Sequence, residues 1–217
     1  LGKSVVARWG ENNYQRIIRE SLERCFQGEE VHNEDWFDFE GQNYGYYKVS
    51  YYPYRNQNGE ITHAIVITHE ITKHKISEND LQHRVEMEQM AATITSRLLH
   101  VADVHMDAEV EHALQMMGEF VKADRSFLNW INEGMTSVEK RLEWCASGIA
   151  PRNQRYGKQE LHNSPNFYRA LLRGEPLIVF PQESQEPDDQ KMRAEKILSM
   201  LIIPLSDSGT LYGTLGF

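Results

Sequence analysis

Residues 61–99 read ITHAIVITHEITKHKISENDLQHRVEMEQMAATITSRLL, and a change of pattern inside this stretch decides the fold. Four isoleucines share one phase of a period-two alternation: Ile61, Ile65, Ile67 and Ile71. That alternation predicts a strand. From Thr72 to Leu99 no Gly or Pro occurs, and polar residues separate the apolar ones at helical spacing. The stretch therefore predicts a strand that runs directly into a long amphipathic helix over 72–99, with Thr72 or Ser77 as its N-cap.

The residues before this stretch predict one helix and two further strands. Over residues 13–27 the apolar positions fall on one helical face: Tyr14, Ile17, Ile18, Leu22 and Phe26. Gly28 is typical of a helix end. Strands are predicted over Val31–Phe39 and Tyr44–Tyr54, and Asn58-Gly59 predicts the hairpin before the third strand. The first 70 residues thus predict a helix followed by a three-stranded antiparallel meander.

The residues after about 105 predict a second domain of the α+β class. A helix is indicated by the spacing of Val110, Leu114, Met117 and Val121. Strands and helices then alternate irregularly: strands at 126–131, 141–146, 176–180, 201–205 and 211–217, and helices at 165–173 and 190–197. The fold class expected for the chain is α+β, with two antiparallel-sheet domains joined by the long helix.

Composition limits the classes of function. The chain has 217 residues, enough for two domains, and a formal net charge of −9, which argues against nucleic acid as a partner. Its apolar runs are too short for a membrane-spanning helix, so no membrane insertion is expected. Cys25 and Cys145 form neither a disulfide framework nor a zinc motif. We expect a cytoplasmic protein.

Four segments of the first third of the chain are informative: Leu1-Gly2-Lys3-Ser4-Val5, Tyr51-Tyr52-Pro53-Tyr54, Asn58-Gly59-Glu60 and Glu70-Ile71-Thr72-Lys73-His74-Lys75. Together they resemble the C-terminal half of a PAS domain. In that family an Asp-Ile-Thr signature joins the last strand to a signalling helix, and Glu70 stands here in place of the Asp. The resemblance covers residues 1–75 and implies that Glu70, Ile71 and Thr72 relay a signal into the helix.

Five segments of the remaining chain are informative in the same way: Ala123-Asp124-Arg125-Ser126, Glu143-Trp144-Cys145-Ala146, Leu172-Arg173-Gly174-Glu175-Pro176, Leu201-Ile202-Ile203-Pro204-Leu205 and Gly213-Thr214-Leu215-Gly216-Phe217. In this order, residues 100–217 resemble a GAF domain without its last elements. A PAS–helix–GAF series is similar to the input region of bacterial histidine kinases and diguanylate cyclases. The resemblance implies a non-catalytic sensory and relay module of a signal-transduction protein, with an output domain downstream in the same polypeptide.

No motif for catalysis or metal binding is found. The nine histidines form no cluster with metal-ligand spacing, and kinase, cyclase and nucleotide-loop motifs are absent from the sequence. Two alternatives remain open at this stage. One is an enzyme on a GAF scaffold of the methionine sulfoxide reductase type, for which Cys145 is the single cysteine in that domain. The other is a dimerisation scaffold without any ligand.

Candidate binding residues come from the second domain. Phe127, Trp144 and Phe167 lie on three separate segments that a pocket brings together, so a small-molecule ligand is expected there. The sequence identifies no cofactor. On the long helix a narrow apolar stripe indicates a homodimer seam: Leu81, Met87, Met90, Ile94 and Leu98. The alternative is that this stripe packs onto its own domains.

Overall fold

The computed structural model describes residues 4–38, 44–152, 159–161, 165–183 and 187–217. Within these residues the chain forms two compact units, Leu1–Met87 and Glu88–Phe217. Each unit combines helices with an antiparallel sheet, which confirms the expected α+β class. Of the residues quoted above, Leu1–Lys3 and Phe39 lie outside the described part.

The first unit begins with short helical segments. These are α1 (Val5–Trp9), α2 (Glu11–Asn13), the π-helical turn η1 (Tyr14–Ile18) and α3 (Arg19–Phe26). After α3, Gly28 has a φ of 101° and its N–H bonds to the Cys25 carbonyl, while the Glu29 N–H bonds to Arg24. This pair of bonds is the Schellman arrangement that ends many helices, and it explains the glycine.

The sheet of the first unit is the predicted meander. Strands β1 (Val31–Asp38), β2 (Tyr44–Arg55) and β3 (Ile61–Glu70) pair in that order, all antiparallel. Between β2 and β3, the Asn56 side chain accepts hydrogen bonds from the Asn58 and Glu60 N–H groups. Gly59 takes a φ of 84° in this turn, as the Asn-Gly pair predicts.

The core of the first unit lies between α3 and one face of this sheet. It contains seven buried residues: Ile18, Cys25, Val31, Phe37, Tyr47, Val49 and Tyr51. Phe26, expected on the buried face of the helix, is 50% exposed, and Cys25 is buried in its place. Seven residues make nearly two full turns, so Cys25 returns to the face of Ile18, whereas Phe26 lies about 80° away.

The isoleucines of β3 are also more exposed than the period-two pattern predicts for the buried face of a strand. Ile65 and Ile67 are 49% and 43% exposed, and Ala64 packs against the core. Ile65 and Ile67 stand opposite Tyr52 and Ser50 on the sheet face that points away from α3. A period-two pattern identifies two faces of a strand, but not which of them the helix covers.

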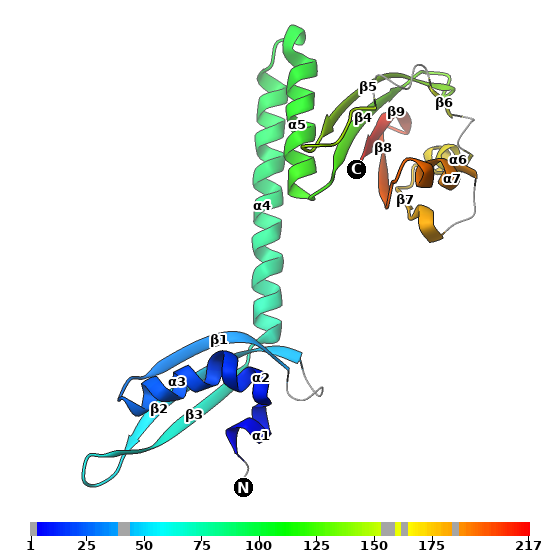
Figure 1. The fold of residues 1–217 in the computed structure, drawn as a ribbon. Coiled ribbons are helices and arrows are strands. Elements are labelled where there is room, and N and C mark those ends of the chain that lie inside the picture. Colours follow the sequence, from blue (N-terminus) through cyan, green and yellow to red (C-terminus); the bar gives the residue numbers. More distant parts are fainter. Residues whose placement is uncertain (1–3, 39–43, 153–158, 162–164, 184–186) are drawn as a thin grey trace. The chain divides into compact units, whose positions relative to one another are not determined.

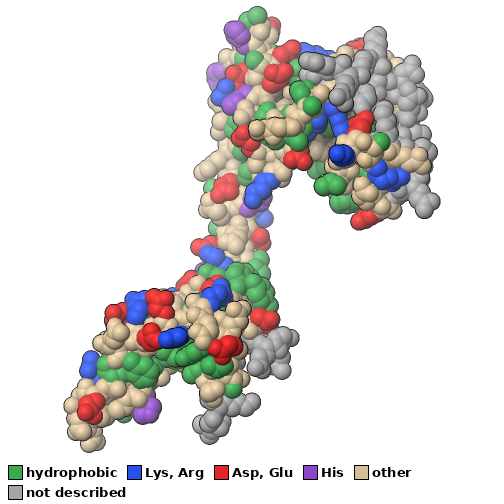
Figure 2. Space-filling model, in the orientation of Figure 1, with side chains coloured by type: hydrophobic (Ala, Val, Ile, Leu, Met, Phe, Trp, Pro, Cys, Tyr) green, Lys and Arg blue, Asp and Glu red, His purple; other side chains and the backbone are tan. Residues whose placement is uncertain are grey.

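Helix α4 (Thr72–His100) follows β3 directly, with one residue between them. Its first half belongs to the first unit and its second half to the second unit. Neither Thr72 nor Ser77 caps it, since the helix starts at Thr72 and the Lys75 N–H bonds to the Ile71 carbonyl. Figure 2 shows charged and polar side chains along the visible face of α4.

The second unit carries a six-stranded antiparallel sheet in the order β6-β5-β4-β9-β8-β7. After η2 (Asp103–His105) and α5 (Met106–Phe120) come β4 (Arg125–Ile131), β5 (Ser137–Cys145), β6 (Gln159–Glu160), α6 (Pro165–Arg173), β7 (Leu177–Val179), η4 (Pro181–Glu183), α7 (Pro187–Ala194), β8 (Met200–Asp207) and β9 (Thr210–Gly216). Ser208 and Gly209 both have positive φ in the hairpin between β8 and β9. This geometry is typical of a type I′ turn.

Most predicted elements of this unit occur near their expected places, with four differences. Strand β5 begins at Ser137, four residues before the expected start, and α7 begins at Pro187. The two-residue strand β6 was not predicted. Val121, assigned to the apolar face of the first helix, lies just past the end of α5 and is 52% exposed. Short edge strands and loop-flanked helices carry too few apolar residues for a periodic signal.

Helices pack on both faces of this sheet (Figure 1). On one face the Ser126 hydroxyl of β4 donates to the Leu114 carbonyl of α5 at 2.6 Å. On the other face Ile131 of β4 packs with Leu161 and with Leu171 of α6. We call these the α5 face and the α6 face. Successive residues of a strand point alternately to the two.

Candidate functional site

The three aromatic residues expected to line one pocket lie on different sides of the sheet. Trp144 stands opposite Ser126 on the α5 face, so close to Gly118 that a Cβ on that glycine would overlap the indole ring. Phe127 follows Ser126 and therefore points to the α6 face. Phe167 lies on α6 and packs with the Leu161–Leu171 cluster. Trp144 therefore joins the sheet to α5 and does not line a pocket with Phe127 and Phe167.

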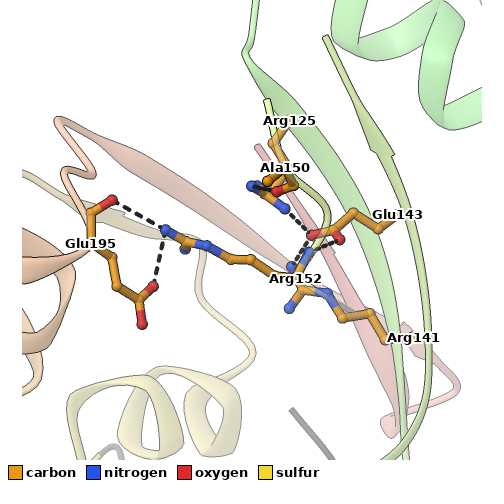
Figure 3. Close-up of polar contacts among 6 residues, drawn as sticks. All are labelled: Arg125, Arg141, Glu143, Ala150, Arg152 and Glu195. Atoms are coloured by element: carbon orange, nitrogen blue, oxygen red, sulfur yellow. Dashed lines mark hydrogen bonds and ion pairs between the residues drawn. The ribbon is translucent and has the colours of Figure 1, made fainter. Parts of the chain in front are cut away.

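The α6 face carries a buried carboxylate surrounded by arginines (Figure 3). The side chain of Glu143 is fully buried and accepts from Arg125 Nη1 at 2.5 Å and from Arg141 Nη2 at 2.9 Å. Its second oxygen, Oε2, accepts from the backbone N–H of Arg152 at 2.6 Å. Two guanidinium groups and one backbone N–H thus bond this carboxylate, and such charge-assisted hydrogen bonds hold it in place.

Arg141 is one of two poorly solvated arginines beside Glu143, together with Arg125. Its guanidinium lies 4.1 Å from the ring centroid of Phe127, and its side chain is 17% exposed. Burial lowers the pKa of Arg141, Glu143 opposes this shift, and the nearby Arg125 and Arg152 add to it. The group stays charged, because arginine side chains are effectively always protonated in proteins. Arg141 is therefore a cation held in a positive and poorly hydrated environment.

Beside Arg141, two polar residues extend across the sheet. Asn129 of β4 stands directly opposite Arg141 of β5 on one side and Thr214 of β9 on the other. Asn129 is 6% exposed and Thr214 is 0% exposed, and Asn129 Nδ2 donates to Thr214 Oγ1 at 3.1 Å. We call Arg141, Asn129 and Thr214 the polar row. It crosses three strands in the interior, where apolar side chains are the rule.

Two atoms of the polar row have no hydrogen-bond partner. Among the described residues, the buried side-chain polar atoms without a partner are Asn129 Oδ1 and Arg141 Nε. Reversing the amide of Asn129 would leave its NH₂ group unpaired instead, so one amide atom remains open in either assignment. Buried polar groups are nearly always paired, so two such atoms on facing residues mark a candidate binding site.

None of the three residues of the polar row is among the binding residues that the sequence predicts, which are all aromatic. A signal was present: Asn129 interrupts the otherwise apolar run Phe127–Ile131, and Arg141 and Glu143 alternate with the buried Leu142. A polar residue in the middle of a central strand needs a partner. The sequence does not show that Asn129, Arg141 and Thr214 share one row, since that depends on the register of three strands.

Cys145 does not have the environment of a nucleophile. It stands opposite Arg125 at the end of β5, and burial raises the pKa of its thiol above the ordinary value. A nucleophilic cysteine requires the thiolate, which a raised pKa disfavours. The structure therefore gives no support to the reductase alternative. Among the described residues, no group of three or more His, Cys, Asp or Glu side chains is placed to hold a metal ion.

The expected relay residues meet at the start of α4. The Ile71 N–H donates to the Tyr46 carbonyl at 2.8 Å, and the Tyr46 N–H donates to Thr72 Oγ1 at 2.9 Å. The Thr72 hydroxyl in turn donates to Glu70 Oε1 at 3.0 Å. Gly45 allows this approach, since a Cβ there would lie 2.8 Å from Thr72 Oγ1. The first turn of α4 is thus bonded to the central strand β2.

The stripe expected at a dimer seam divides into two parts. Leu81 and Met87 are 63% and 47% exposed. Met90, Ile94 and Leu98 are half-buried at a spacing of four, in the part of α4 that lies beside α5 in Figure 1. There Arg97 Nε donates to Glu109 Oε2 of α5 at 2.7 Å. The second part of the stripe is therefore partly covered within the chain, whereas its first part is exposed.

No helix of the described residues has the length and apolar character needed to cross a bilayer. A family profile described as GAF domain matches residues 105–217. The methanogenesis regulatory histidine kinase FilI of Methanothrix harundinacea (strain 6Ac) is 28% identical over 170 residues, which are 76% of this chain and 19% of that protein. The chain thus spans about a fifth of this curated relative.

Two solved structures are examples of those similar to this chain. One is the photoproduct state of GAF3 from Slr1393 of Synechocystis sp. PCC6803, at 17% identity and a TM-score of 0.40, covering 51% of this chain and 74% of that chain. Another is the far-red absorbing dark state of JSC1_58120g3 with bound biliverdin, at 11% identity and a TM-score of 0.46, covering 59% and 81%. Because the profile match extends over more than half of its residues, the chain belongs to the GAF domain family.

Proposed function

We propose that the chain is the non-catalytic sensory and relay region of a cytoplasmic signalling protein of the histidine kinase or diguanylate cyclase type. In this proposal the second unit senses a small molecule, the first unit is the C-terminal half of a PAS domain, and an output domain lies elsewhere in the polypeptide. The GAF match and the regulatory kinase relative support the sensory role. The meander β1–β3 followed directly by α4 is compatible with the PAS assignment.

The observation that carries this proposal is the attachment of α4 at each of its ends. The first turn is bonded to β2 through Tyr46, Ile71 and Thr72. Near its last turn, Arg97 forms two hydrogen bonds with Glu109 of α5, and α5 packs on the sheet that carries the polar row. A ligand that favours one packing of this sheet against α5 would thereby bias α4.

The test has two stages. The purified chain is first incubated with a small-molecule extract of cells, and native mass spectrometry identifies the retained species. Hydrogen exchange of the free and bound chain is then compared over residues 44–217. We expect a retained species and a change in exchange that reaches the first turn of α4. If no species is retained, the sensory role is wrong; if the change stays within 105–217, the relay role is wrong.

Two matched variants sharpen the second stage. Thr72→Val removes the hydroxyl that bonds Tyr46 and Glu70. Thr95→Val removes a hydroxyl that bonds only the Ala91 carbonyl one turn earlier in the same helix. We expect Thr72→Val to abolish the ligand-dependent change at residues 44–47 and Thr95→Val to leave it intact. Equal behaviour of the two variants would contradict a relay through the β3–α4 junction.

Dimerisation through α4 is a second candidate function, which a specific observation favours. Four large apolar side chains of the first part of α4 are exposed: Ile76, Leu81, Val85 and Met87. Of these four, Leu81 and Val85 are four residues apart and therefore share one face of the helix, as pairing with a partner helix requires. We propose a homodimer with its seam on this part of α4, in addition to the sensory role.

A double variant tests the seam without disturbing either unit. Leu81→Glu with Val85→Glu introduces like charges at exposed positions, and should shift the protein to a monomer in sedimentation equilibrium. Gln82→Glu with Gln89→Glu adds the same charge at exposed polar positions and should leave the dimer intact. Substitution of Met90 or Ile94 is less informative, because both are half-buried within the chain. A monomeric wild type would refute the seam.

A further inference from the structure

We propose that the polar row binds a small organic carboxylate that carries a neutral hydrogen-bond donor beside the carboxylate and an apolar tail. Arg141 would hold the carboxylate and Asn129 the donor. This ligand class rests on the sensory function proposed above and makes it more specific. The site lies on the α6 face of the second sheet.

The open atoms of the polar row define two of the ligand's groups. Arg141 Nε is a donor and requires an acceptor, and Asn129 Oδ1 is an acceptor and requires a donor. Arg141 and Asn129 stand directly opposite each other on β5 and β4, with their side chains on the same face. Facing Cβ atoms of such a pair are about 5 Å apart. A carboxylate and a hydroxyl or amide N–H on adjacent carbons match this spacing.

The local charge selects a monoanion. Among the ion pairs of the described residues, Arg152 is paired with Glu195 at 2.9 Å, whereas Arg125 and Arg141 share the single carboxylate of Glu143. One positive charge is therefore left over. A carboxylate neutralises it, whereas a phosphate monoester carries about −1.5 to −2 at neutral pH and would leave an excess of negative charge. A ligand with an ammonium donor would add a like charge beside Arg141, so the donor should be neutral.

An apolar cluster beside the polar row provides the place for a tail. Ile131 lies two residues beyond Asn129 on β4 and packs with Leu161 and Leu171. Phe167 and Leu211 pack against the same cluster. The Phe127 ring is less suited to this purpose, because Arg141 lies over it and Gly216 lies against it. The ligand is therefore expected to extend from Asn129 toward Ile131.

Access to the polar row requires movement. The two open atoms are buried, so the α6 side must separate from the sheet before a ligand can enter. Association coupled to such a change is expected to be slower than about 10⁵ M⁻¹s⁻¹. We therefore expect the ligand to bind the polar row slowly.

The experiment uses a chemical pair and a matched variant of the whole chain. The probe is leucate, the α-hydroxy acid analogue of leucine, and its comparison compound is isocaproate, the same acid without the hydroxyl. Calorimetric titration measures both with the wild type, Asn129→Leu and Arg141→Met. Asn33→Leu is the control, since Asn33 is an asparagine of the first sheet whose amide donates to Ser21. Backbone NMR shifts at Thr214 locate the binding.

We expect leucate to bind the wild type about tenfold more tightly than isocaproate, which is the worth of one hydrogen bond. In Asn129→Leu the two acids should bind equally, because the partner of the hydroxyl is gone. Arg141→Met should abolish binding of both, and Asn33→Leu should change neither. Shifts at Thr214 should accompany binding.

Three results would overturn the proposal: no binding of leucate at about ten millimolar, an unchanged preference for leucate in Asn129→Leu, or shifts confined to residues away from the polar row. The sensory function would survive any of them if the cell extract supplied a retained ligand of another class. Failure of both the extract and the probe would overturn the two proposals together.

Discussion

The two sheets of this chain bury different kinds of side chain under their helices. The sheet of the first unit places Val31, Phe37, Val49 and the rings of Tyr47 and Tyr51 against α3. The sheet of the second unit carries the Arg141–Asn129–Thr214 row and the Glu143 cluster on its α6 face. The first arrangement is what hydrophobic burial alone produces. The second includes unpaired buried atoms, which stability alone does not explain.

This difference assigns separate roles to the units. In the first unit, the buried amide of Asn13 donates to the Asp38 carbonyl, and Asn33 donates to the Ser21 hydroxyl. Its interior is thus complete without a ligand among the residues described. In the second unit the open atoms of Asn129 and Arg141 reduce stability in the free state. Ligand-binding sites commonly lower the stability of the free protein in this way.

The largest effect is expected from Phe37→Ala in the first unit. Phe37 is 0% exposed and packs edge-on against Tyr47. Loss of a buried phenylalanine typically costs about 3–5 kcal/mol, a large share of the stability of a small unit. Calorimetry should show the transition of the first unit lost or strongly lowered and that of the second unit unchanged. Equal shifts of both transitions would contradict the independence of the two cores.

Glu143→Gln should weaken the second unit to a similar or slightly smaller extent. It leaves Arg125 and Arg141 without their buried carboxylate, and breaking such a pair costs about 3–5 kcal/mol. The matched control is Glu34→Gln in the first sheet, where Glu34 forms an exposed pair with Lys48. That change should cost less than about 1 kcal/mol. Urea unfolding of the two variants measures the contrast, and similar losses would refute it.

Asn129→Leu should have a smaller effect. It removes an unpaired amide oxygen, which favours the folded protein, and it also removes the hydrogen bond to Thr214, which disfavours it, so we expect a net change close to zero. The same change at Asn33 removes a hydrogen bond to Ser21 and should cost about 1 kcal/mol. Chemical unfolding of both variants measures the difference. A loss of stability in Asn129→Leu comparable to that in Asn33→Leu would show that the polar row is structural.

The smallest effect concerns the pH dependence of the α4–α5 contact. The hydrogen bonds from Arg97 lower the pKa of Glu109. A lowered folded-state pKa stabilises the contact above the ordinary glutamate value of about 4.3, and this stabilisation is lost as the pH falls through the lowered value. The hydrogen-exchange protection factors of residues 94–100, which are corrected for the intrinsic pH dependence of exchange, should therefore fall as the pH drops below about 4.3. Arg97→Gln should remove this dependence; persistence of it would exclude the pair as its cause.

Particular residues show how far the sequence alone leads. The alternation in Tyr44–Tyr54, the Asn-Gly hairpin and the absence of Gly and Pro from Thr72 to Leu99 predict β2, the turn and α4, because local backbone preference and periodicity act over neighbouring residues. The sequence also predicts the strand-to-helix junction at Glu70, Ile71 and Thr72. It does not predict that Thr72 accepts a hydrogen bond from the Tyr46 N–H. The fold class and most element positions are properties of this kind.

Only the tertiary structure decided which residues share a site. The sequence groups Trp144 with Phe127 because both are aromatic. Phe127 pairs with Glu143 and shares its face, so Trp144, the next residue on β5, points to the opposite face. Arg141 lies 12 residues after Asn129 along the chain, and Thr214 lies 85 residues after it. The register of β5, β4 and β9 brings the three residues into one row. Strand register depends on the packing of the whole sheet, and a shift of one residue would send each side chain to the other face.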